Sequence, residues 1–265
     1  MVKRWMNNGP KYRLSEQTIM DMEHGVVLYR IIAERTFESI ERIIKKGTVG
    51  GYVCGYHNLS QDDRCWVDDN AKIFGQAKVL ENAFVKGSSM ISDDAEISGY
   101  SKVIGCAIVR ENALIGGESV IEDNAIVEGN VIVQDHCRVI ENATVTGDVQ
   151  LYDRCIIGGN AYLYGKAELR GRCEVNGSAI IGGHSRIEEF VTVRDKAIIK
   201  EHAFIHGRCL INGNAKIFGY SDISYDVGGL SIINVSLSER KESIPFLKKN
   251  FIESLDIERG GNHRK

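Results

Sequence analysis

Aliphatic residues recur at every sixth position through most of the chain. From Val67 to Ile223, every position reached by stepping six residues is Val, Ile or Leu. The fifth residue of each six-residue unit is Ala, Ser, Cys or Val, the third is usually Gly, Asp or Glu, and the fourth is often Asn. A period of six fits neither an α-helix, with its period of about 3.6, nor a simple strand, with a period of about two. It fits a short strand followed by a turn, repeated without a break.

Three such units close one triangular coil, so equivalent positions lie eighteen residues apart and stack as parallel strands. The pattern therefore predicts an all-β solenoid of about 9–10 triangular coils, with the branched aliphatic side chains inside. Gly or Asn near each corner is expected to hold the backbone at positive φ, which these residues adopt at low cost.

The eighteen-residue spacing also predicts columns of identical side chains. Asn124, Asn142 and Asn160 share one column, in which stacked amides can bond between coils. Another column contains cysteines, namely Cys137, Cys155, Cys173 and Cys209. Free cysteine behaves as a small buried hydrophobe, so we interpret this column as packing rather than as a disulfide or zinc site.

Three domains follow from the limits of the repeat: an N-terminal cap over residues 1–48, the solenoid over 49–228 and a C-terminal part over 229–265. In the cap, "KYRLSE" and "VVLYRIIAER" are typical of strands, and "TFESIERIIKKG" predicts a short helix that ends at Gly47. The cap is thus expected to be a small α/β unit.

The C-terminal part begins with "SIINVSL", which predicts a strand. It continues with an amphipathic helix in "SIPFLKKNFIESLDI", which has Ser243 as a plausible N-cap. The final "ERGGNHRK" is expected to be disordered.

The repeat resembles that of the hexapeptide-repeat proteins, whose fold is a left-handed parallel β-helix and many of which are acyltransferases. Residues 11–75, with "KYRLSE", "LYRIIA" and "GTVGGYVCGYHNLSQDDRCWVDDNA", are similar to the YdcK-type members of bacteria and phages. The resemblance implies a capped solenoid and offers no active-site motif to carry over. It also implies a possible acyl-CoA co-substrate such as acetyl-CoA, with no permanently bound cofactor.

Composition narrows the function classes. The formal net charge is −3, and no cluster of basic residues suggests DNA or an acidic membrane surface. No apolar run reaches the roughly 18 residues that a membrane span needs. The start of the chain lacks the apolar region of a secretory signal, and the cysteine count of 7 is odd. We therefore expect a cytoplasmic protein.

One outward-facing column is apolar, which is unusual for a monomer surface. Its members are Met90, Ile108, Ile126, Thr144, Tyr162, Ile180 and Ile198, with Lys72 and Lys216 at its two ends. Related acyltransferases are trimers that pack solenoid faces together, so this column predicts a homotrimer interface. The alternative is that the predicted C-terminal helix lies on it.

Histidines and arginines at the corners are the candidate site residues. His184 and His202 lie eighteen residues apart, and His206 follows on the next face. In an acyltransferase, one of them would act as the general base. A second corner column contains Arg154, Arg172 and Arg208, which could meet the phosphates of coenzyme A or of a nucleotide.

A zinc site would need three converging histidines. The spacing of His184, His202 and His206 differs from that in the carbonic anhydrases of this fold, so no metal is predicted. The bland interpretation of each histidine is a polar residue at an exposed turn.

Two functions remain. The first is an acyl-CoA-dependent acyltransferase that acts in a groove between subunits. The second is a non-catalytic scaffold that holds a small anionic, nucleotide-like ligand or a protein partner. The repeat has no inserted loop to frame an acceptor pocket, so acceptor recognition would fall to the N-terminal cap, to the C-terminal segment or to neither.

Overall fold

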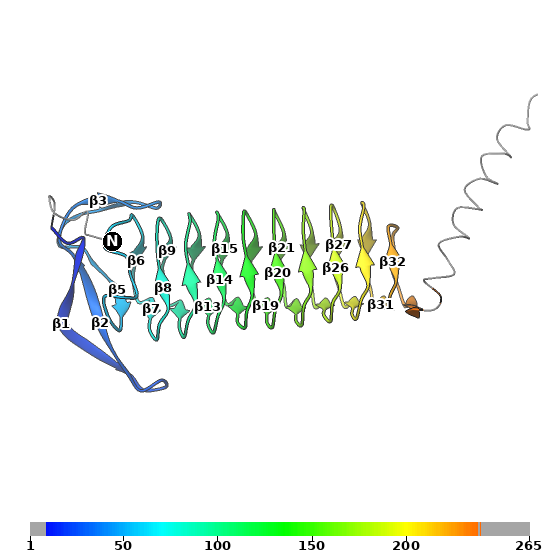
Figure 1. Cartoon of the computed structure of the whole chain (residues 1–265), viewed down its shortest axis with the longest axis horizontal. Helices are drawn as coiled ribbons and strands as arrows, with labels where there is room; N and C mark the ends of the chain where they lie inside the picture. The colour runs from blue at the N-terminus through cyan, green and yellow to red at the C-terminus, as the bar shows by residue number, and fades with distance from the viewer. Residues whose placement is uncertain (1–8, 238, 240–265) are drawn as a thin grey trace, which may run out of the picture.

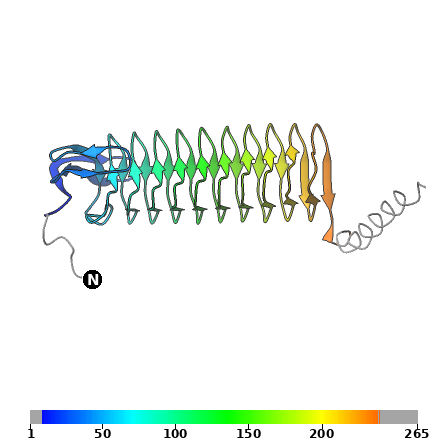
Figure 2. The ribbon, with the colours of Figure 1, turned by 90° about the horizontal axis from the view of Figure 1, so that it is seen from above.

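The chain folds into a parallel β-solenoid of about ten turns, of the left-handed β-helix type (Figures 1 and 2). The computed structural model describes residues 9–237 and residue 239. Each turn contributes one short strand to each of three sheets, which form the walls of a long prism. The all-β solenoid predicted by the six-residue period is confirmed.

The three walls are named sheets 1, 2 and 3. Sheet 1 has 13 strands, in the spatial order β1 (Tyr12–Asp21), β2 (Val26–Ala33), β5 (Val49–Val53), β7 (Lys72–Ile73), β10 (Met90–Ile91), β13 (Ile108–Val109), β16 (Ile126–Val127), β19 (Thr144–Val145), β22 (Tyr162–Leu163), β25 (Ile180–Ile181), β28 (Ile198–Ile199), β31 (Lys216–Gly219) and β33 (Ile232–Val235). Sheet 2 has 9 strands, namely β8 (Lys78–Val79), β11 (Glu96–Ile97), β14 (Leu114–Ile115), β17 (Ile132–Val133), β20 (Gln150–Leu151), β23 (Glu168–Leu169), β26 (Arg186–Ile187), β29 (Phe204–Ile205) and β32 (Asp222–Ile223). Sheet 3 also has 9 strands, namely β6 (Trp66–Val67), β9 (Phe84–Val85), β12 (Lys102–Val103), β15 (Val120–Ile121), β18 (Arg138–Val139), β21 (Ile156–Ile157), β24 (Glu174–Val175), β27 (Thr192–Val193) and β30 (Leu210–Ile211). The chain visits sheets 3, 1 and 2 in turn, and each corner is named by the two sheets that it joins.

The interior is a stack of aliphatic layers. Val127 is the register partner of Val145, which is in turn the partner of Leu163, and all three side chains are fully buried. The neighbouring strand residue points outward because successive side chains of a strand alternate between its faces. The small fifth residue of each unit fills the inside of a corner, where a larger side chain would not fit.

The corners have positive φ at the third residue of the six, which is glycine, aspartate or glutamate. Asp153, for example, has a φ of 64°. No asparagine of the described residues has a positive φ, so that part of the corner prediction is wrong. At most of the acidic positions the carboxylate accepts an N–H from the turn above: Asp153 Oδ2, for example, accepts from the Gly171 amide at 2.8 Å. The bond satisfies a backbone donor that the strands leave unpaired.

The predicted amide ladder is present at corner 3–1. The Asn124 side chain donates to Asn142 at 3.1 Å, and Asn142 donates to Asn160 at 3.3 Å. The asparagines thus stabilise the corner by linking successive turns through their side chains, and not by adopting a positive φ.

The cap extends sheet 1 beyond the first turn. Strands β1 and β2 pair antiparallel, and β2 pairs antiparallel with β5, which continues into the parallel stack. Both cap strands predicted from the sequence are confirmed. The Asp21 carboxylate at the end of β1 accepts a hydrogen bond from Lys72 Nζ at 2.7 Å, which ties this hairpin to the outer face of the solenoid.

The helix predicted before Gly47 is wrong. The segment forms an antiparallel ribbon of β3 (Phe37–Glu38) and β4 (Ile43–Ile44), which we call the clasp. Phe37 lies opposite Ile44 in its register, so an apolar spacing that suits one face of a helix is satisfied equally by a ribbon. The Ser39 hydroxyl closes the turn by accepting the Arg42 N–H at 3.1 Å. The cap is therefore all-β in the described part of the chain.

The clasp lies on the outer face of sheet 3 at the first turns. Its Phe37 ring meets the Trp66 ring edge-on at a centroid distance of 5.6 Å, and Trp66 is completely buried. Glu41 forms an ion pair with Lys102, and Arg42 forms one with Asp68. The clasp, which lies outside the repeat, thus covers the first turns of sheet 3.

At the other end, β33 confirms the strand predicted after the repeat. The predicted amphipathic helix around Ser243 and the tail lie outside the described residues. Within the described part of the chain, no helix has the length and apolar character to cross a bilayer.

Candidate functional site

Two of the predicted histidines stack on each other at corner 1–2. The His184 and His202 rings have a centroid distance of 5.0 Å and an interplanar angle of 10°. Tyr220 continues the stack on the next turn, 4.7 Å from His202. The ring faces are thus occupied by one another, and neither histidine has a carboxylate partner among the described residues.

The third histidine lies on a different surface. His206 follows Phe204 on the outer face of sheet 2, with the two rings 4.6 Å apart. Its Nε2 atom lies 3.0 Å from Asp222 Oδ1. No ring contact or hydrogen bond joins His206 to the other two in the described residues. Of the three, only His206 has the carboxylate neighbour that orients a general base.

The arginine column lies at corner 2–3, on the far side of sheet 2 from the histidine stack. Arg154, Arg172 and Arg208 are all exposed and have no ion pair with another described residue. The Arg208 guanidinium lies 5.5 Å from the centroid of the Phe190 ring. The column presents positive charge on a convex edge, where a ligand would remain largely in water.

The cysteine column packs inside corner 2–3. All four thiols are buried and free of disulfides, and the Cys173 Sγ donates to the Arg170 carbonyl at 3.0 Å. Burial, followed by the charge of Asp226, raises the pKa of the Cys209 thiol. Such a thiol is a poor nucleophile, which fits the packing role.

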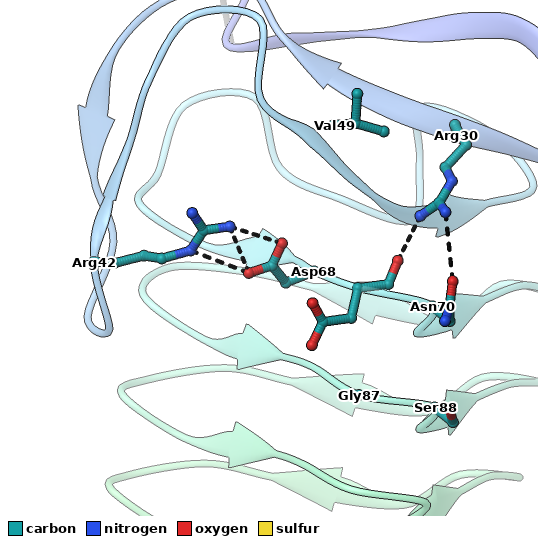
Figure 3. A pocket seen from close by; sticks show the side chains of 8 residues that line it. Arg30, Arg42, Val49, Asp68, Asn70, Gly87 and Ser88 are labelled. Atoms are coloured by element: carbon teal, nitrogen blue, oxygen red, sulfur yellow. Dashed lines mark hydrogen bonds and ion pairs between the residues drawn. The ribbon is translucent and has the colours of Figure 1, made fainter.

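A cavity of about 560 Å³ lies where the cap meets the solenoid (Figure 3). We call it the junction cavity. Four parts of the chain line it: Arg30 of β2, Arg42 of the clasp, Val49 of β5, and corner 3–1 of the first two turns. The corner contributes Asp68, Asp69, Asn70, Gly87 and Ser88. In Figure 3 the two arginines enter from opposite sides.

Arg42 is held by a buried carboxylate. Its Nε and Nη2 atoms donate to both oxygens of Asp68 at 2.8–3.2 Å, and the Asp68 side chain is only 5% exposed. A two-point contact of this kind fixes the plane of the guanidinium. Because Asp68 would be left buried without a counter-ion, Arg42 cannot leave it at low cost. The Nη1 edge of Arg42 has no partner among the described residues.

Arg30 is fixed in another way. Its Nη1 donates to the Gly50 carbonyl at 2.8 Å and to the Asp69 carbonyl at 2.5 Å, and its Nη2 donates to Asn70 Oδ1 at 3.4 Å (Figure 3). The guanidinium lies 4.2 Å from the centroid of the Tyr52 ring. The Nε atom has no partner among the described residues. Both arginines therefore enter the cavity preorganised, each with N–H groups to spare.

The corner residues add further polar groups. The Asp69 carboxylate, the Ser88 hydroxyl and the Gly87 N–H form no hydrogen bond with another described residue. Gly87 has a φ of 84°, and a Cβ there would lie 2.6 Å from the Gly105 carbonyl oxygen, so the position requires glycine. The cavity thus offers donors and an acceptor that the fold does not use.

Sequence reasoning missed the junction cavity. Arg30 and Arg42 belong to no repeat, and the segment around Arg42 was expected to be helical. The sequence holds no signal for it: the second residue of a six-residue unit is expected to point outward, and only the structure shows that Asp68 is buried and needs a cation from elsewhere in the chain.

Comparisons with known proteins give no match: no family model fits the chain, and no curated protein matches it. Among the described residues, no group of three or more His, Cys, Asp and Glu side chains is placed to hold a metal ion. The resemblance to hexapeptide-repeat proteins therefore rests on the repeat and its fold.

Proposed function

We propose that the protein is a non-catalytic binding module that holds a small anionic ligand in the junction cavity. The observation that carries this proposal is the pair of guanidinium groups, Arg30 and Arg42, each fixed by its own contacts. The Nε atom of Arg30 and the Nη1 atom of Arg42 have no partner among the described residues. Ligand sites are concave and largely preformed, with a few polar groups that fix orientation. The solenoid contributes rigidity, because all its layers share one register.

Charge sets the expected mode of recognition. Asp68 and Asp69 offset the two arginines, so the cavity does not attract anions through net charge. Affinity would come from placed N–H groups that meet the ligand oxygens without reorganisation. This favours a ligand with a compact anionic group over a long polyanion.

Isothermal titration of the full chain with a panel of nucleotides, acetyl-CoA and inorganic phosphate tests the proposal. We expect binding by at least one phosphate compound that Arg30→Gln weakens by about tenfold or more, the loss expected for one charged hydrogen bond. Arg208→Gln is the matched control and should leave binding unchanged. The reverse result would move the site to the corner column of Arg154, Arg172 and Arg208.

A second candidate function is acyl transfer from an acyl-CoA such as acetyl-CoA, favoured by the His206–Asp222 pair. With Nε2 facing Asp222, the Nδ1 atom would be the basic nitrogen of His206. The assay is release of free coenzyme A from acetyl-CoA in the presence of amine and hydroxyl acceptors. We expect His206→Ala to remove this release, while His184→Ala and His202→Ala preserve it; no release with any acceptor rejects this candidate.

We also propose the homotrimer. The apolar column on sheet 1 supports it, because Met90, Ile108, Ile126, Ile180 and Ile198 are half-buried in one chain and Tyr162 is exposed. Sedimentation equilibrium of the full chain tests this, and Ile126→Glu should shift the mass toward the monomer. A wild-type mass of one chain would reject the interface.

A further inference from the structure

Asp69 differs from the other aspartates at the same corner position. Six aspartates have a positive φ, at residues 69, 93, 123, 135, 153 and 195. In five of them the carboxylate accepts the N–H of the residue eighteen positions later, at 2.8–3.1 Å. Asp69 is the exception among these aspartates in the described part of the chain, and its side chain forms no hydrogen bond or ion pair there; of the glutamates with positive φ, Glu111 and Glu189 are also unbonded. It is also the aspartate of this group that lines the junction cavity.

The Asp69 carboxylate is exposed and bonds to no other described residue, and unlike the unbonded Glu111 and Glu189 it lines the junction cavity. Nothing in the solenoid requires an acidic residue at this corner, since glycine adopts the same backbone at many equivalent positions. The neighbouring Gly87 N–H, which a carboxylate accepts elsewhere in the ladder, is left unpaired at the same place. A free acceptor and a free donor thus both line the junction cavity.

The polar groups of the cavity are complementary to a ligand with two different parts. The free N–H groups of Arg30 and Arg42 suit the oxygens of a phosphate. The Asp69 carboxylate suits a group that donates hydrogen bonds, and two adjacent hydroxyls can each donate to one of its oxygens. An anion alone would make no use of the Asp69 carboxylate and would approach its negative charge. A neutral sugar would leave the guanidinium edges unused.

We infer that the ligand carries a phosphate group and a vicinal diol, as ribonucleotides and sugar phosphates do. The phosphate lies against Arg30 and Arg42, and the diol donates to Asp69. A cavity of about 560 Å³ is within the size range of small-molecule sites. This inference rests on the proposed binding function and specifies the chemical class of its ligand.

Isothermal titration of the full chain with matched compounds tests the inference. Adenosine monophosphate and ribose phosphate contain both parts, dideoxyadenosine monophosphate lacks the diol, and adenosine lacks the phosphate. We expect the two complete compounds to bind and each incomplete one to bind at least about tenfold more weakly. If adenosine monophosphate and its dideoxy analogue bind equally, the diol is overturned while the proposed anion site stands. If no phosphate compound binds, both are overturned.

The variant Asp69→Asn tests whether the preference for a vicinal diol depends on the Asp69 carboxylate. We expect this variant to bind dideoxyadenosine monophosphate as the wild type does, and to lose most of the preference for the ribose form. Asp123→Asn is the matched control, because Asp123 occupies the same corner three turns further on and its carboxylate accepts the Glu141 N–H. It should keep the preference. An unchanged preference in Asp69→Asn would overturn the assignment, and the comparison of compounds on the wild-type chain stands even if this variant fails to fold.

Discussion

The solenoid body and the cap junction are stabilised by different kinds of contact. In the body, each residue repeats the environment of the residue eighteen positions earlier, as in the column of Val127, Val145 and Leu163. At the junction, single side-chain contacts join distant segments, such as Arg42 with Asp68 and Lys72 with Asp21. Repetition yields a rigid but uniform surface. The cap adds groups from outside the repeat to one end of this surface, where Arg30 and Arg42 line the junction cavity.

The largest expected loss of stability comes from a substitution in the interior of the solenoid body. Ile157 is fully buried, whereas Ile156 on the same strand is 36% exposed and points outward. Ile157→Ala should lower the free energy of unfolding by about 2–5 kcal/mol, because it leaves a cavity in a closed layer. Ile156→Ala should cost less than about 1 kcal/mol. Chemical denaturation measures both, and equal losses would contradict the inward and outward assignment.

A smaller loss of stability is expected at two glycines that have the same φ of 87°, Gly47 in the cap and Gly147 in the solenoid body. A Cβ on Gly147 would lie 2.9 Å from the Gly165 carbonyl oxygen, whereas a Cβ on Gly47 has open space around it. Gly47→Ala should cost about 1–2 kcal/mol for the left-handed backbone alone. Gly147→Ala should cost more, since the next turn must also move. Thermal unfolding of the two variants, monitored by circular dichroism, checks the difference in sign and size.

The third prediction concerns the attachment of the cap. Hydrogen bonds from Lys72 and then from His24 hold the pKa of Asp21 well below its usual range. A carboxyl with a lower pKa in the folded chain contributes stability above its unfolded pKa, near 4, and that stability is lost as the pH falls below this value. Limited proteolysis of the β1–β2 hairpin should therefore accelerate below about pH 4.

Asp21→Asn is the variant that isolates this contact. At neutral pH it should weaken the attachment by about 1.5–3 kcal/mol, the contribution of a hydrogen bond to a charged group. It should also flatten the acid dependence of hairpin cleavage. Cleavage that depends on pH in the same way in the variant would show that another carboxyl is responsible.

The same comparison explains what the sequence could predict. The interior could be predicted because every sixth residue is aliphatic and these residues must point inward. The Asn124 and Cys137 columns follow from the same count. The structure of the clasp could not be predicted by counting, because the spacing of Phe37 and Ile44 fits either one face of a helix or a paired ribbon. The partner that decides between them, Trp66, is distant in sequence and belongs to the solenoid.

The corner residues show a similar division. The positions of the turns and the asparagine ladder were predicted, but the positive φ expected of asparagine is wrong: Asn142 bonds along the stack, while acidic residues such as Asp153 adopt the positive φ. Counting placed His184 and His202 at one corner and His206 on the next face. The junction cavity could not be predicted, because Arg30 and Arg42 reach Asp69 and Asp68 through contacts that no period encodes.

A crystal structure of the full chain grown with adenosine monophosphate tests the central claim most directly. We predict density for the phosphate between Arg30 and Arg42, with the ribose hydroxyls against the Asp69 carboxylate. Density for the nucleotide at the Arg154, Arg172 and Arg208 column or beside His206, with the junction cavity holding only solvent, would contradict the account.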